Sequence, residues 1–155
     1  MSGIEPVVKS VHVPSPPARA FTMFATRLGR WWPRAHHLGS TALVDVVLEP
    51  AAGGRLYSQH EGGQQIVFGH VLAWEPPALL RFTWEISADW KLDAALASQV
   101  DVRFMPAGSE TRVELTHSHL DVLGPEAGAR MRSDVERGWP ALLKQYFDFL
   151  LQSQG

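Results

Sequence analysis

GPEAGARMRSDVERGWPALLKQYFDFLLQSQ, residues 124–154, is the stretch around which the rest of the chain is organised. A helix turns by about 100° per residue, and at that spacing the large apolar side chains of the stretch share one stripe. They are Met131, Val135, Trp139, Leu142, Leu143, Tyr146, Phe149 and Leu150. Pro125 suits the first position of a helix, whereas Pro140 removes a hydrogen bond from the interior. The stretch predicts one long amphipathic helix that is kinked, or divided into two abutting helices, at Gly138-Trp139-Pro140.

The residues upstream of this helix mostly alternate between apolar and polar with period two, which indicates strands. The expected strands cover residues 7–13, 43–49, 55–61, 65–74, 79–86, 98–105 and 110–119, and two short helices are expected over 18–28 and near 31–33. Short turns between consecutive strands require antiparallel pairing, and a sheet with one apolar face needs a cover. The sequence therefore predicts an α+β fold in which a seven-stranded antiparallel sheet packs against the C-terminal helix.

Alternation also predicts which side chains face that helix. Phe82 and Trp84 share one face of their strand, Phe104 lies on the inner face of the next, and Leu115, His117 and His119 share the inner face of the last. Glu85 and Glu114 fall on the outer face and are interpreted as surface charges. The strand at 65–74 is apolar on both faces, so its orientation stays open.

Composition limits the function classes. Net charge is −2 with no basic run, which argues against nucleic acid as the main partner. The chain has no cysteine, and this excludes disulfides, thiolate metal sites and cysteine nucleophiles. No apolar run approaches the roughly 20 residues that span a membrane, and no signal pattern opens the sequence. Residues 1–155 are expected to form one cytoplasmic domain without membrane association.

Several short motifs occur in order along nearly the whole chain. They are Trp31-Trp32-Pro33, Glu49-Pro50, Gly53-Gly54-Arg55, Gly69-His70-Val71, Trp74-Glu75-Pro76-Pro77, Phe82-Thr83-Trp84, Arg103-Phe104, the run 111–117 and Gly138-Trp139-Pro140. With the order of elements, this set resembles the START-like, helix-grip superfamily (SRPBCC), in the branch of the activator of heat-shock-protein ATPase homologues. One departure is Phe68, where that branch leads us to expect tryptophan.

The resemblance implies a curved seven-stranded sheet that grips the C-terminal helix, with an apolar cavity between them. Superfamily members bind lipids, hormones and polyketides, and some act as cyclases or ring-oxygenase subunits. The eponymous branch stimulates a chaperone ATPase. Fold transfers through such a resemblance far better than function does.

We expect the cavity walls to be formed by Trp32, Phe82, Trp84, Phe104, Leu115, Trp139 and Leu143, with His117 and His119 as the polar contacts. Two histidines at this spacing are compatible with four roles. They could bind a ligand carboxylate or phenol, act as a general base, supply metal ligands, or be ordinary histidines at the sheet rim whose hydrogen bonds are satisfied. A metal needs a third ligand, which the sequence does not offer on the same face, so neither metal nor cofactor is expected. His36-His37 is a loop pair beside the tryptophans.

Three functions are compatible with these patterns. The first is a non-catalytic module, monomeric or homodimeric, that binds a small apolar or aromatic molecule in the cavity. The second is a cyclase, dehydratase or hydrolase that uses His117 or His119 for acid–base chemistry; no serine lies in a Gly-x-Ser-x-Gly context. The third is a stress-related, co-chaperone-like interaction protein, which predicts a filled cavity and an exposed apolar patch.

Overall fold

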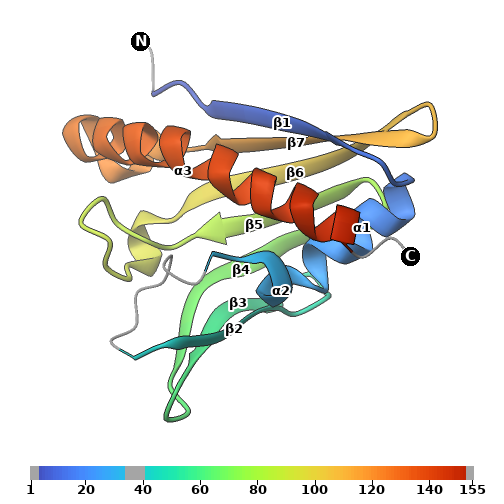
Figure 1. Ribbon diagram of the computed structural model, residues 1–155. Helices are drawn as coiled ribbons and strands as arrows, with labels where there is room; N and C mark the ends of the chain where they lie inside the picture. The colour runs from blue at the N-terminus through green and yellow to red at the C-terminus, as the bar shows by residue number, and fades with distance from the viewer. Residues whose placement is uncertain (1–3, 34–40, 153–155) are drawn as a thin grey trace.

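A computed structural model describes residues 4–33 and 41–152, and it shows one antiparallel sheet that curls around a long helix (Figure 1). The strands are β1 (Val7–Val13), β2 (Leu43–Leu48), β3 (Arg55–His60), β4 (Gln65–Glu75), β5 (Leu79–Trp84), β6 (Ser98–Ala107) and β7 (Glu110–Ser118). The α-helices are α1 (Pro17–Ala25), α2 (Leu28–Trp31) and α3 (Pro125–Gln152), and the 3-10 turns are η1 (Ala94–Leu96) and η2 (Leu120–Leu123).

The strand order across the sheet is β1-β7-β6-β5-β4-β3-β2. Six strands therefore form a meander, and β1 joins its far edge by pairing with β7. In Figure 1, β1 and β2 lie on opposite sides of α3, while α1 and α2 close the end of the sheet near the C-terminus of α3. The predicted α+β helix-grip fold with seven antiparallel strands is confirmed.

Helix α3 runs as a single element from Pro125 to Gln152, with Pro140 inside it. The alternative of two abutting helices is therefore wrong. Val135 and Trp139 are buried before the proline, and Leu142 is buried after it. Each such side chain contributes about 1.5–3 kcal/mol when buried, which offsets the roughly 3 kcal/mol that an interior proline costs. Within the described residues, no helix is long and apolar enough to cross a membrane.

Strand β4, apolar on both faces, changes face because its pairing is irregular. The register shifts against β3 between Leu56 and Tyr57, and against β5 between Val71 and Ala73. As a result Phe68 and Val71 are both buried although they are an odd number of residues apart. Such bulges insert an extra residue and re-aim the side chains that follow, so the period-two pattern is lost.

Glu85 corrects one expectation. The strand was expected to continue to Ile86, with the Glu85 carboxylate as a surface charge, but β5 ends at Trp84 and Glu85 is only 8% exposed. Its Oε2 lies 2.7 Å from His70 Nδ1 and accepts the Thr83 hydroxyl proton at 2.5 Å. A carboxylate can be buried here because these side chains satisfy it.

Replacing glycine by alanine should have opposite effects on the free energy of unfolding at Gly69 and Gly138. A Cβ on Gly69 would collide with the carbonyl oxygen of Thr83, whereas a Cβ on Gly138 would meet no atom within 4 Å. We expect Gly69→Ala to lower the free energy of unfolding by about 1–3 kcal/mol, because backbone must shift. Gly138→Ala should raise it by up to about 1 kcal/mol, because alanine favours a helix interior. Urea denaturation measures both, and equal effects of the two substitutions would contradict this account.

Candidate functional site

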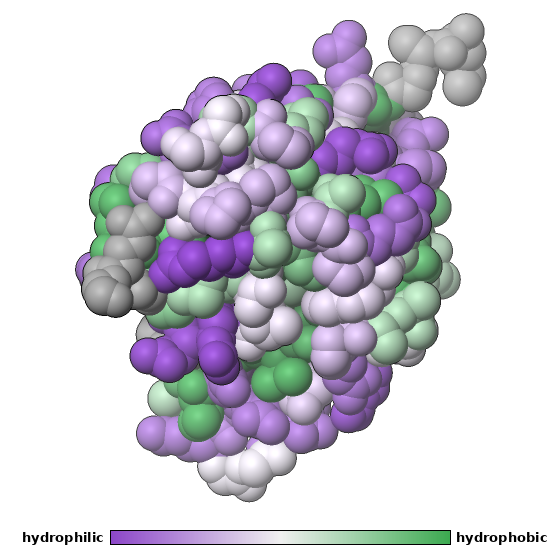
Figure 2. Space-filling model, turned by 90° about the vertical axis from the view of Figure 1, so that its right-hand side faces the viewer, coloured by the Kyte–Doolittle hydropathy of each residue, from purple (hydrophilic) through white to green (hydrophobic). Residues whose placement is uncertain are grey.

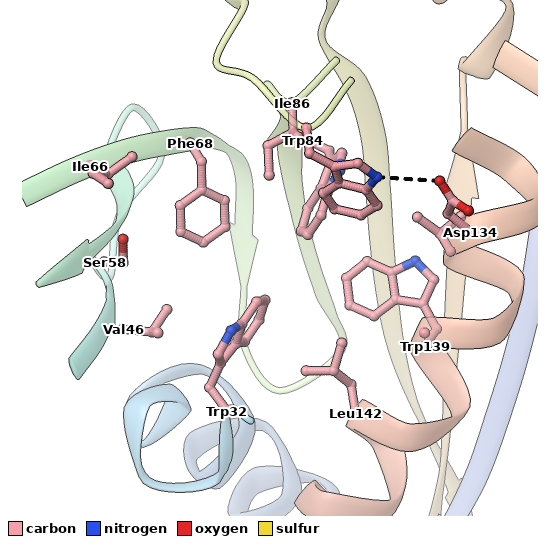
Figure 3. Close-up of a pocket in the computed structure, with 13 residues that line it drawn as sticks. Trp32, Val46, Ser58, Ile66, Phe68, Trp84, Ile86, Asp134, Trp139 and Leu142 are labelled. Carbon is pink, nitrogen blue, oxygen red and sulfur yellow. Dashed lines mark hydrogen bonds between the residues drawn. The ribbon is translucent and has the colours of Figure 1, made fainter. Parts of the chain in front are cut away.

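A pocket of about 450 Å³ lies between α3 and the part of the sheet formed by β2, β3, β4 and β5 (Figure 3). Its wall consists of Trp32, Val46, Ser58, Ile66, Phe68, Trp84, Ile86, Trp90, Asp134, Val135, Gly138, Trp139 and Leu142. Pockets for drug-sized molecules have volumes of about 300–1,000 Å³ and apolar walls with a few polar groups. The size and composition of this pocket are therefore those of a small-molecule site.

One wall of the pocket is an arc of aromatic rings in edge contact. The ring centroids are 6.0 Å apart for Trp32 and Phe68, 5.8 Å for Phe68 and Trp84, and 5.3 Å for Trp84 and Trp139. Tilted and T-shaped contacts of this kind hold rings in fixed orientations. Phe68, the departure from the motif pattern, stands in the middle of the arc, where its phenyl ring takes less room than an indole.

Gly138 contributes to the pocket by lacking a side chain. It lies inside α3, where glycine costs about 1 kcal/mol relative to alanine. It has no left-handed backbone angle, and no neighbour approaches closely enough to require glycine. The open space beside its Cα belongs to the pocket. From the sequence Gly138 was interpreted as part of a helix break, whereas the structure places it in the pocket wall.

The rim of the pocket is closed by a hydrogen bond between two segments. Trp90 belongs to the loop after β5, which is closed by an antiparallel bridge between Ile86 and Leu92. The Trp90 indole N–H donates to Asp134 Oδ2 on α3 at 3.3 Å, drawn as a dashed line in Figure 3. Trp90 is 42% exposed, so this contact stands at the boundary between pocket and solvent.

Behind the aromatic arc lies His117, which is fully buried. Its Nδ1 accepts a hydrogen bond from the indole N–H of Trp139 at 3.1 Å. Since an indole nitrogen only donates, the ring proton of His117 must sit on Nε2, which donates to Ser98 Oγ at 2.7 Å. Burial lowers the pKa of His117 from about 6.5 to about 3. The imidazole is therefore neutral at pH 7, and both of its nitrogens are engaged.

Two residues of the pocket wall, Trp84 and Ser58, carry buried polar groups. Trp84 Nε1 is a buried donor without a hydrogen-bond partner among the described residues. Ser58 is 3% exposed, and its hydroxyl lies 2.7 Å from His60 Nε2. A buried donor without a partner costs free energy unless a water or a ligand satisfies it.

The structure brings together three of the nine predicted site residues, Trp32, Trp84 and Trp139. Phe82 and Leu115 are buried in the general core. Phe104 packs against Phe21 of α1, with ring centroids 5.1 Å apart, away from the pocket.

Leu143, His117 and His119 also lie outside the pocket wall. Leu143 lines a separate groove between β1 and α3. His117 stands behind Trp84 and Trp139 rather than beside a ligand space. The expectation that His119 shares its direction is wrong, because β7 ends at Ser118 and His119 takes a left-handed conformation, φ 60°, with an exposed side chain. The pair His36-His37 lies outside the described residues.

Other wall residues were missed by the sequence reasoning. Val135 and Leu142 flank Trp139 on the helical stripe, so their position could have been inferred from it. Ser58 has the same parity on β3 as Leu56 and His60, so alternation predicts that it points inward. Alternation does not distinguish an inward residue of the pocket from one of the core. Trp90 and Asp134 come from a loop and from the polar side of the helix, and periodicity gives no signal for either.

The neutral state of His117 predicts a pH dependence of stability. Because its pKa is lower in the folded chain, the unfolded chain binds more protons at this ring between pH 6.5 and about 3. The free energy of unfolding should therefore fall with decreasing pH by up to about 1.4 kcal/mol per pH unit from this group alone. His117→Gln should remove that contribution, so the wild-type and variant stabilities, measured in urea from pH 7 to pH 4.5, should converge as pH falls. Parallel curves would contradict the account.

Comparisons with known proteins agree with this fold. The family model described as "Activator of Hsp90 ATPase homolog 1-like protein" matches residues 14–150. A solved structure, "An anthrahydroquino-Gama-pyrone synthase Txn09 complexed with SUM", is 35% identical, with a TM-score of 0.64, over 96% of this chain and 99% of that chain. The self-sacrificing resistance protein CalC from Micromonospora echinospora is 25% identical, with a TM-score of 0.68, over 97% of this chain and 98% of that chain.

A third structure, protein MLL2253 from Mesorhizobium loti, is 21% identical with a TM-score of 0.70, over 97% of this chain and 99% of that chain, and shows the fold alone. The search of curated proteins found no match. The family match spans most of the sequence, and the helix-grip architecture is present. The chain belongs to the family of Activator of Hsp90 ATPase homolog 1-like proteins, within the START-like (SRPBCC) superfamily.

Proposed function

We propose that this chain binds a small planar aromatic molecule in the pocket beneath α3. The observation that carries the proposal is the pocket of about 450 Å³ whose walls include four tryptophans and Phe68. Flat rings gain most from aromatic walls, because they can lie in face or edge contact with several of them. The relative that is 35% identical is named an anthrahydroquino-gamma-pyrone synthase, a name that refers to a fused aromatic system.

The polar groups of the wall narrow the ligand class. The indole N–H of Trp84, which has no partner in the part of the chain that the structure describes, suits a carbonyl or ether oxygen. The oxygen of Ser58 lies on the other side of the pocket in Figure 3, next to Val46 and Ile66, and suits a hydroxyl donor. We therefore expect aromatic ligands with a carbonyl group and a hydroxyl group to bind more tightly than unsubstituted aromatic hydrocarbons.

The surface supports a ligand-binding role over a co-chaperone-like one. An interaction protein was expected to have a filled cavity and an exposed apolar patch. Among the described residues, the large exposed hydrophobic side chains are instead distributed over several elements, with only Trp90 and Leu92 in the same loop: Val8, Val44, Leu72, Trp90, Leu92, Val122 and Leu151. On the face shown in Figure 2, hydrophobic and hydrophilic side chains are mixed.

Binding can be measured by titrating intrinsic tryptophan fluorescence with fatty acids, flavonoids, aromatic acids and aromatic ketones. We expect the aromatic members to change the emission, because four of the six tryptophans line the pocket. Gly138→Leu would project a side chain into the pocket from a Cβ position that has no atom within 4 Å, and it should weaken binding by about tenfold or more, or about 1.4 kcal/mol.

Gly138→Ala is the matched control, since its methyl group takes little of the space, and it should bind nearly as the wild type does. A flat response across the panel would sink the proposal. So would equal binding by Gly138→Leu and the wild type.

A further inference from the structure

Asp134 is the one charged residue of the pocket wall among the residues that the structure describes. It lies on α3, and in Figure 3 it stands on the opposite side of the pocket from Ser58. Its side chain is 33% exposed, so most of it is withdrawn from water. A negative charge in such a place attracts a positive charge on a ligand more strongly than it would in free solvent.

The Asp134 carboxylate has capacity for a further hydrogen bond. Its Oδ2 accepts the Trp90 indole N–H at 3.3 Å, and its Oδ1 accepts from Arg137 Nη2 at 3.2 Å. Both distances lie at or beyond the upper end of the usual range of about 2.7–3.2 Å, and a carboxylate offers about four acceptor positions. Arg137 is 76% exposed, and an ion pair with so exposed a cation contributes little. The carboxylate can therefore accept from an ammonium group without losing a strong bond.

The aromatic rings beside Asp134 favour the same charge on a ligand. Trp90 is hydrogen-bonded to Asp134, and Trp139 lies next to Asp134 on α3 in Figure 3. The face of an indole ring carries partial negative charge, which attracts a cation within about 6 Å of the ring centre. The described part of the wall contains no lysine, arginine or histidine that would supply this positive charge. A ligand can supply it instead.

We infer that the pocket takes an aromatic ligand that carries a protonated amine. The rings of the ligand lie against the arc of Trp32, Phe68 and Trp84, and its ammonium group lies at the rim, where it donates to Asp134. This inference rests on the proposed aromatic pocket and adds the charge of the ligand to it. No covalent bond is made or broken, so Asp134 determines specificity and is not a catalytic residue.

The same carboxylate disfavours ligands that place an acidic group at the rim. An aromatic carboxylate there brings two negative charges together in partly desolvated surroundings, which costs free energy. The other charged side chains near the rim do not reverse this preference. Arg130 on α3 and Asp89 in the loop after β5 are 60% and 69% exposed and pair with each other at 3.4 Å, and Lys91 is exposed as well. Water and salt weaken the effect of charges that are so exposed.

Three naphthalene derivatives of similar size separate the effect of charge from the effect of the ring. They are 2-naphthylmethylamine, a cation at pH 7, 2-naphthylmethanol, which is neutral, and 2-naphthoate, an anion. Isothermal titration calorimetry at pH 7 and low salt measures their dissociation constants. The wild type should bind the amine about tenfold more tightly than the alcohol, and it should bind the anion more weakly than the alcohol.

Asp134→Asn removes the charge and keeps an oxygen that can accept the Trp90 N–H. It should weaken binding of the amine by about tenfold and leave binding of the alcohol within about twofold of the wild type. The matched control is Asp148→Asn, which removes the same charge from another ion pair of α3, formed with Lys144 at 3.0 Å outside the pocket wall. This variant should bind all three ligands as the wild type does.

An amine that binds no more tightly than the alcohol would overturn the inference and leave the proposed function standing. Equal losses of affinity for amine and alcohol in Asp134→Asn would overturn it as well, because they indicate a change of pocket shape and not of charge. The inference also fails alone if none of the three ligands binds while the fluorescence panel responds. If none of them binds and the panel is flat, the inference and the proposed function fail together.

Discussion

The hydrogen bond from the Trp139 indole to His117 Nδ1 is the interaction on which the pocket depends. It joins α3 to β7 in the core, and it selects the tautomer that also satisfies Ser98. With both histidine nitrogens occupied, a polar ring can be buried without a net loss of hydrogen bonds. The bond fixes the orientation of the Trp139 indole ring. Because Trp139 contacts Trp84, this hydrogen bond also helps to orient the aromatic wall of the pocket.

The pocket occupies one side of α3 only, and the two sides of the helix differ for physical reasons. Toward α1, Tyr146 is fully buried and donates its hydroxyl proton to the Ala20 carbonyl at 2.7 Å, which closes that end of the core. Toward β2, β3 and β4, Gly138 presents no side chain, and Ser58 replaces what would otherwise be an apolar contact. The cavity therefore lies beside Gly138, where α3 has no side chain to fill the space between the helix and the sheet.

The sequence predicted the fold well because periodicity is repeated along every element, and it predicted the site only in part. Three tryptophans were found because large rings on inward-facing positions near the helix must meet. His119 was misplaced because it follows the last residue of β7, where alternation stops. Glu85 was expected to be exposed, but contacts with His70 and Thr83 cover its carboxylate. The inward-facing side chains of β4 could not be predicted, because the alternation of apolar and polar residues does not show where a bulge occurs. The hydrogen bond between Ser58 and His60 joins two residues of one strand, and alternation alone does not predict that they bond.

The central claim, that a ligand lies against four specific tryptophans, is tested most directly by the indole N–H signals in a nitrogen–proton NMR spectrum. We predict that the tightest-binding aromatic ligand shifts the signals of Trp32, Trp84, Trp90 and Trp139, which line the pocket. The signals of Trp31, which donates to the Met23 carbonyl, and Trp74, which packs on Phe21, should stay in place. Shifts confined to Trp31 and Trp74, or no shift at the four pocket signals, would contradict the account.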